Sequence, residues 1–176
     1  MTGDVSGRTG DFVFSPPSRF WVYFTLIASW LLDISPISGH SFSPGFLALT
    51  ITFWSVHEHR LVGMLLPFLF GLLIDVSHGI VLGQHALSYT VLSYGALLMQ
   101  RRIPWFSHLG QALHVLPLFL AAQFVVLFIR LWLGGVFPGW TWFGQSFVTA
   151  LLWPLWSMIL VMPQRRRPPG MSHEGN

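Results

Sequence analysis

The sequence has no cysteine and no lysine, and only 9% of its 176 residues are charged. Without cysteine the chain can form neither a disulfide framework nor a thiolate metal site. A soluble domain has about 25% charged residues, so this chain has too few charges to cover a surface that faces water. Because 53% of the residues are hydrophobic, the composition indicates a membrane protein.

The cationic side chains are all arginines, nine in number, and the formal net charge is +3. In a soluble protein a basic balance suggests nucleic acid. Here the arginines lie at the edges of hydrophobic runs, which indicates orientation in a membrane, with anionic lipids as partners and no nucleic acid. Since the first eighteen residues are polar and no small-residue cleavage site follows the apolar run from Phe20, we expect an uncleaved first span.

Apolar runs separated by polar or Pro/Gly-containing breaks predict one transmembrane domain over residues 19–163. We expect an all-α integral membrane protein, a bundle of six transmembrane helices, with a mobile cytoplasmic tail over 1–18 and a basic cytoplasmic tail over 164–176. The HEHR segment, 57–60, suits a tight turn between antiparallel helices. The expected spans are about 20–37, 44–56, 61–76, 80–100, 109–133 and 142–162.

The distribution of arginine supports six spans, because cytoplasmic loops are enriched in basic residues. Six spans place eight arginines on the side of both termini and only Arg130 on the other. Five spans, made by fusing the third and fourth through Gly79, would place Arg165, Arg166 and Arg167 on the opposite side and weaken this asymmetry. We expect Asp33 at the outer interface and both termini in the cytoplasm. The topology anchors are Arg19, Arg60, Arg101, Arg102, Arg165, Arg166 and Arg167.

The stretch over residues 66–94 is apolar enough for a membrane, yet it carries ionisable side chains in its middle. Such groups are costly in hydrocarbon, so they face the protein interior or serve a function. We expect Asp75 to accept backbone N–H groups at the start of the fourth helix, or to pair with His78 or His85. No spacing here indicates a metal site, a cofactor site or a serine hydrolase.

One half of the fourth helix is polar, at about 100° per residue, and must face other helices rather than lipid. Two interpretations stay open: a set of interhelical hydrogen bonds, or a lined cavity for a ligand. Gly79 and Gly83, spaced G-x-x-x-G, would let a neighbouring helix approach closely. The polar half comprises Gln84, His85, Ser88, Tyr89 and Ser93. The candidates for helix packing or partner binding are Gly71, Asp75, Gly79, Gly83 and His85.

The run G-L-L-I-D-V-S-H-G-I-V-L-G-Q-H-A-L-S-Y, residues 71–89, resembles the signature of the bacterial rod shape-determining protein MreD family. That family shows G-x-x-x-D, then a hydroxyl or small residue and glycine, then L-G and a small residue near A-L. Other residues match in order: Arg19 precedes an aromatic first span, Pro44 opens the second, and L-W-P-L-W, residues 152–156, precedes the basic C-terminus.

The resemblance implies a non-enzymatic scaffold of the cell-elongation (rod) complex in the bacterial inner membrane, needed for rod shape and lateral-wall peptidoglycan synthesis. It implies binding to MreC, and with it a connection of MreB filaments to RodA and a class B penicillin-binding protein. It also implies a fold similar to the six-helix substrate-binding subunits of vitamin uptake transporters, and no cofactor. The alternative is a transporter-like subunit that binds a small molecule or lipid along the polar half of the fourth helix.

Overall fold

The computed structural model describes residues 18–35, 43–100 and 108–162, and every regular element in these ranges is helical. The predicted tails and five of the expected anchors, Arg101, Arg102 and 165–167, lie outside the described residues. In chain order the helices are α1 (Arg19–Ile34), α2 (Phe46–His57), α3 (His59–Val62), α4 (Leu65–Ser77), α5 (Gln84–Met99), α6 (His108–Trp132), the 3-10 helix η3 (Trp140–Phe143) and α7 (Gly144–Val161).

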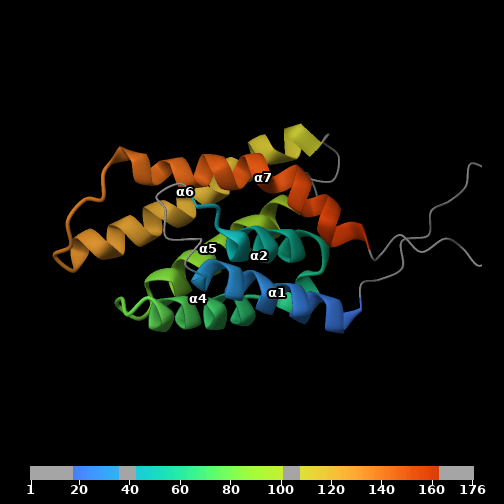
Figure 1. The fold of residues 1–176 in the computed structure, drawn as a ribbon, viewed down its shortest axis with the longest axis horizontal. Helices are drawn as coiled ribbons and strands as arrows, with labels where there is room; N and C mark the ends of the chain where they lie inside the picture. The colour runs from blue at the N-terminus through green and yellow to red at the C-terminus, as the bar shows by residue number, and fades with distance from the viewer. Residues whose placement is uncertain (1–17, 36–42, 101–107, 163–176) are drawn as a thin grey trace, which may run out of the picture.

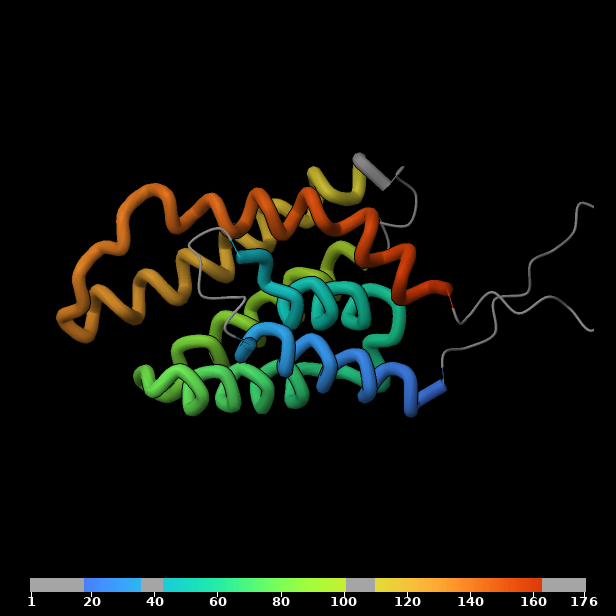
Figure 2. Tube along the Cα trace, viewed as in Figure 1, coloured from blue at the N-terminus to red at the C-terminus, as the bar shows by residue number. Residues whose placement is uncertain are grey.

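The long helices run alternately in opposite directions, so the start of α1 and the end of α7 lie at the same end of the bundle (Figures 1 and 2). The connection from α2 to α4 lies there too, and we call this the Arg19 end. The connections from α4 to α5 and from α6 to α7 lie at the other end, the Arg130 end. Among the described arginines, Arg19 and Arg60 therefore share one end and Arg130 lies at the other.

Helix α2 lies at the centre and packs against α1, α5 and α7. Nine of its twelve residues are buried, as expected of a helix that is apolar on all sides. Its hydroxyl groups bond to neighbouring helices: Thr50 Oγ1 lies 2.6 Å from Ser29 Oγ and accepts from Trp156 Nε1 at 2.9 Å. These bonds fix α2 relative to α1 and α7.

The outer surface suits lipid, because the outer helices expose large apolar side chains such as Phe24, Leu69 and Phe128. By length and composition, two segments are long and apolar enough to cross a membrane, Gly110–Trp132 and Trp140–Val161. Helices α2 and α4 have 12 and 13 residues, fewer than the roughly 17–25 of a full span. The six-span count therefore stays a prediction.

The two connections beside α4 differ from the sequence-based expectation. The expected 57–60 turn is extended by a short helix, α3 (His59–Val62), which is followed by Gly63 with φ of 54°. The fourth long helix begins at Gln84 rather than near residue 80. Gly79 and Gly83 have φ of 62° and 101°, left-handed values that favour glycine and are incompatible with a continuous α-helix.

Candidate functional site

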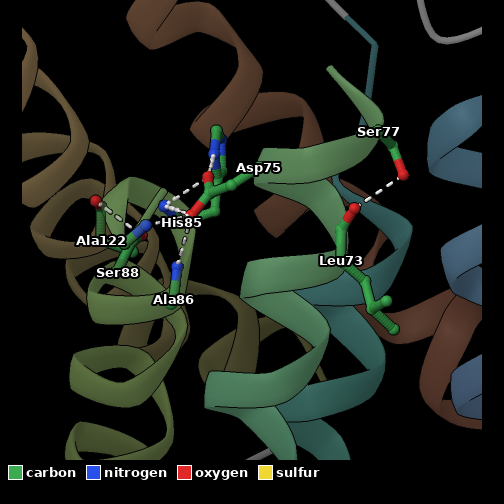
Figure 3. Close-up of polar contacts among 8 residues, drawn as sticks. Leu73, Asp75, Ser77, His85, Ala86, Ser88 and Ala122 are labelled. Carbon is green, nitrogen blue, oxygen red and sulfur yellow. Dashed lines mark hydrogen bonds and ion pairs between the residues drawn. The ribbon is translucent and has the colours of Figure 1, made fainter. Parts of the chain in front are cut away.

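Asp75 lies in the last turn of α4, is fully buried, and accepts hydrogen bonds from the start of α5 (Figure 3). The backbone N–H of Gly83 donates to Oδ2 at 2.8 Å, and that of His85 donates to Oδ1 at 2.9 Å. His85 Nδ1 lies 2.8 Å from the same Oδ1. The hydrogen bonds to N–H groups at the start of the next helix and the pairing with His85, expected as alternatives, are both present. The carboxylate satisfies donors that a helix N-terminus leaves without partners.

Asp33 holds the start of α2 in a similar way, a role that the sequence analysis missed. It lies near the end of α1, and its two oxygens accept from the backbone N–H groups of Phe46 at 2.9 Å and Leu47 at 3.0 Å. Two acids, each from the preceding helix, therefore fix the starts of α2 and α5 at the Arg130 end.

The three candidate glycines divide into two roles. A Cβ atom at Gly71 would overlap the backbone of Ala86, so the absence of a side chain allows α4 and α5 to touch. No described heavy atom lies within 4 Å of a Cβ built at Gly79 or Gly83. Within the described residues these two glycines shape the turn between α4 and α5, and their role in packing a partner helix stays a prediction.

The polar half of α5 faces the bundle interior. Gln84, Ser88, Tyr89 and Ser93 are all buried. Ser88 Oγ donates to the carbonyl of Ala122 on α6 at 2.8 Å (Figure 3). Ser93 Oγ donates to the carbonyl of Gly63 at 3.1 Å and shares a 2.9 Å hydrogen bond with another hydroxyl, on α2. Interhelical hydrogen bonding, one of the two interpretations left open, therefore accounts for Ser88 and Ser93.

A cavity also adjoins this half of α5. It has a volume of about 110 Å³ and lies between α5, α6, α7 and the start of α2. Its polar lining residues are His85, Ser88, Tyr89, Gln123, Gln145, Ser146 and Thr149. Gln123 Nε2 donates to the carbonyl of Trp142 at 3.2 Å and its Oε1 accepts from Ser146 Oγ. Sequence analysis did not single out the three α7 residues, because only the folded chain brings them opposite α5.

Two groups on the α5 side of the cavity are available for a further hydrogen bond. The Tyr89 side chain is only 8% exposed, and its hydroxyl has no hydrogen-bond partner among the described residues. His85 uses Nδ1 for Asp75, which leaves Nε2. Small-molecule sites have volumes of about 300–1,000 Å³, so a cavity this small suits water or one small polar group. Within the described ranges no cluster of three His, Asp or Glu residues is placed to hold a metal.

Comparison with known proteins identifies similar sequences over almost the whole bundle. The family model for rod shape-determining protein MreD matches residues 17–162. The rod shape-determining protein MreD of Haemophilus influenzae is 27% identical over 154 residues, which are 84% of this chain and 92% of that protein. No solved structure matches.

Proposed function

This chain belongs to the rod shape-determining protein MreD family, and from that membership we propose that it is a non-enzymatic scaffold of the rod complex. Membership itself gives it a role in determining rod shape and makes it a membrane protein. The proposal adds that it acts by binding MreC, and with it MreB, RodA and a class B penicillin-binding protein, in lateral-wall peptidoglycan synthesis. It also places both termini on the cytoplasmic side of the inner membrane.

The family match over residues 17–162 carries this proposal, because it includes every described helix. Two features of the fold support it. The turn between α4 and α5 is short, so a partner would meet this part of the chain chiefly through helices and turns. The half-buried Asp33 and the buried Asp75 have both oxygens occupied by donors from the next helix, which suits a rigid framework.

Depletion of the protein followed by microscopy tests the proposed role. We expect cells to lose rod shape and to recover it when wild-type protein is supplied. Asp75→Ala should fail to restore rods, whereas Glu58→Ala should restore them, because no described hydrogen bond depends on the Glu58 side chain. If an added nutrient restored normal shape to depleted cells, this result would overturn the scaffold proposal in favour of a transporter-like subunit.

MreC binding near the turn between α4 and α5 is tested by co-purification from membranes. Gly83→Leu alone is ambiguous, because Gly83 has a left-handed φ and donates to Asp75. Leu82→Ser changes an exposed side chain of the same turn, and Phe20→Ser is a matched control at the Arg19 end. We expect Leu82→Ser to reduce the recovery of MreC and the control to leave it unchanged. Equal recovery with both variants would exclude this turn as the contact.

The polar cavity supports a second candidate function, a subunit that binds a small molecule. Native mass spectrometry of purified protein should then show a retained molecule that Ser88→Ala combined with Tyr89→Phe releases. This pair is sharper than a change of Gln84 together with His85, because Gln84 lines a different groove. Protein that is consistently empty would count against this candidate. The volume of about 110 Å³ favours the scaffold.

A further inference from the structure

A groove of about 330 Å³ lies at the Arg130 end, between the turn that joins α4 to α5 and the end of α6. It is lined by Gly79, Ile80, Val81, Gln84, Arg130, Leu133 and Gly135. It is three times the volume of the polar cavity and falls within the range of about 300–1,000 Å³ that ligand sites occupy.

Arg130 brings a positive charge to this groove. Its side chain is exposed. The described carboxylates are Asp33, Glu58 and Asp75, and none of them lies within 4 Å of the guanidinium. The other described arginines lie at the opposite end of the bundle (Figure 1). The charge of Arg130 is therefore not compensated by any described residue.

Gln84 supplies a second polar group. Its side chain is 8% exposed and lines the groove. The amide makes no hydrogen bond to the residues that the structure describes, and its polar atoms keep some access to the groove. A ligand in the groove would satisfy this amide, which offers two N–H donors.

The rest of the lining suits the boundary between headgroups and acyl chains. Ile80, Val81 and Leu133 are apolar, and the two glycines leave the backbone open to close approach. Trp132, which follows Arg130 on the same helix, is 78% exposed. Exposed tryptophans are enriched at the level of lipid headgroups.

We propose that Arg130 and Gln84 bind a phosphate group, carried by the headgroup of an anionic lipid or by free phosphate. A guanidinium matches the oxygens of phosphate with two parallel hydrogen bonds, and the Gln84 amide adds a neutral donor. This site lies at the end opposite Arg19 and Arg60, so it is distinct from the orientation anchors. It stands whether or not the protein binds MreC.

The test uses purified full-length protein in nanodiscs of phosphatidylcholine that contain phosphatidylglycerol, with retained lipid counted by native mass spectrometry. We expect wild-type protein to retain phosphatidylglycerol selectively. Arg130→Gln should weaken retention about tenfold or more, the effect of one lost hydrogen bond to a charged group. Gln84→Met should weaken it less, because the lost donor is neutral. Arg19→Gln, the same loss of charge away from the groove, is the matched control and should weaken retention less than Arg130→Gln does.

A second arm adds inorganic phosphate to distinguish the sources of the phosphate group. Retained lipid that millimolar phosphate does not displace supports a lipid site. Phosphate binding without lipid retention, lost in Arg130→Gln, supports a site for the free ion. Because Arg130 is exposed, the variant should melt as the wild type does. Retention by Arg130→Gln equal to that of Arg19→Gln, with no phosphate binding by the wild type, would overturn the proposal.

Discussion

At the scale of single residues, Asp75 shows how a carboxylate can be buried in an apolar chain. An isolated ion in a low-dielectric interior costs several kcal/mol. Here two backbone N–H groups and the His85 ring surround the carboxylate, and it lies at the N-terminus of α5, where negative charge is favoured. With both oxygens occupied, its role is to hold α5 against α4.

Asp75→Ala should therefore lower the free energy of unfolding by about 3 kcal/mol, the cost of losing hydrogen bonds to a charged group and leaving N–H groups buried. Unfolding in mixed micelles by added denaturing detergent measures this. Glu58→Ala, the matched acid, should change stability by less than about 0.5 kcal/mol. Equal losses in the two variants would contradict the role assigned to Asp75.

Tyr89 and Ser93 are both buried on α5, but removal of their hydroxyl groups should change the free energy of unfolding by different amounts. The Ser93 hydroxyl is hydrogen-bonded to Gly63 and Ser55, so Ser93→Ala should lower the free energy of unfolding by about 1 kcal/mol. The Tyr89 hydroxyl faces the cavity with no partner among the described residues, so Tyr89→Phe should change stability by less than about 0.5 kcal/mol. The same unfolding assay compares them. A larger loss in Tyr89→Phe would show that the cavity holds a bound group.

At the scale of elements, the helix locations follow from apolar runs and from Pro/Gly breaks, because the bundle interior and the lipid-facing surface both require apolar side chains. The contact of Asp75 was predictable since its partners lie within ten residues. That of Asp33 was missed because Phe46 lies thirteen residues further along the chain, in another helix. The G-x-x-x-G pattern could not reveal the turn between α4 and α5, because the spacing alone does not show that α5 begins after Gly83.

Gly71 and Gly95 offer a matched pair for the contacts of α4 and α5. A methyl group at Gly71 meets the backbone of Ala86, which cannot move alone, whereas one at Gly95 meets the end of the Leu118 side chain. Gly71→Ala should therefore lower the free energy of unfolding by about 1–3 kcal/mol, because the added methyl group overpacks the contact. In Gly95→Ala the higher helix propensity of alanine contributes up to about 1 kcal/mol of stability, which offsets the steric contact with the Leu118 side chain. Unfolding of both variants measures the difference, and a smaller loss at Gly71 would contradict the close approach.

At the scale of the whole molecule, the two ends of the bundle differ. The Arg130 end has helix starts fixed by Asp33 and Asp75, the groove lined by Arg130 and Gln84, and the exposed Trp140. The Arg19 end has Arg19 and Arg60, and the first described helix begins there and the last one ends there (Figure 2). Because basic residues favour the cytoplasmic side, this difference predicts which end faces inward, a property that no contact within the chain determines.

Cysteine labelling tests this orientation, and the absence of native cysteine makes each substitution the sole target. His59→Cys reports on the Arg19 end and Thr141→Cys on the Arg130 end, since both side chains are exposed. In right-side-out vesicles a membrane-impermeant maleimide should label Thr141→Cys at once and His59→Cys only after permeabilisation.

Ser157→Cys, buried in α7, should resist labelling in both conditions and shows that the fold is intact. The reverse order of labelling at His59 and Thr141 would invert the bundle. Immediate labelling of both would show that the chain does not adopt a single orientation. Arg130 would then lie on the inner side in the first case and on both sides in the second, and the asymmetry of arginine would have another cause.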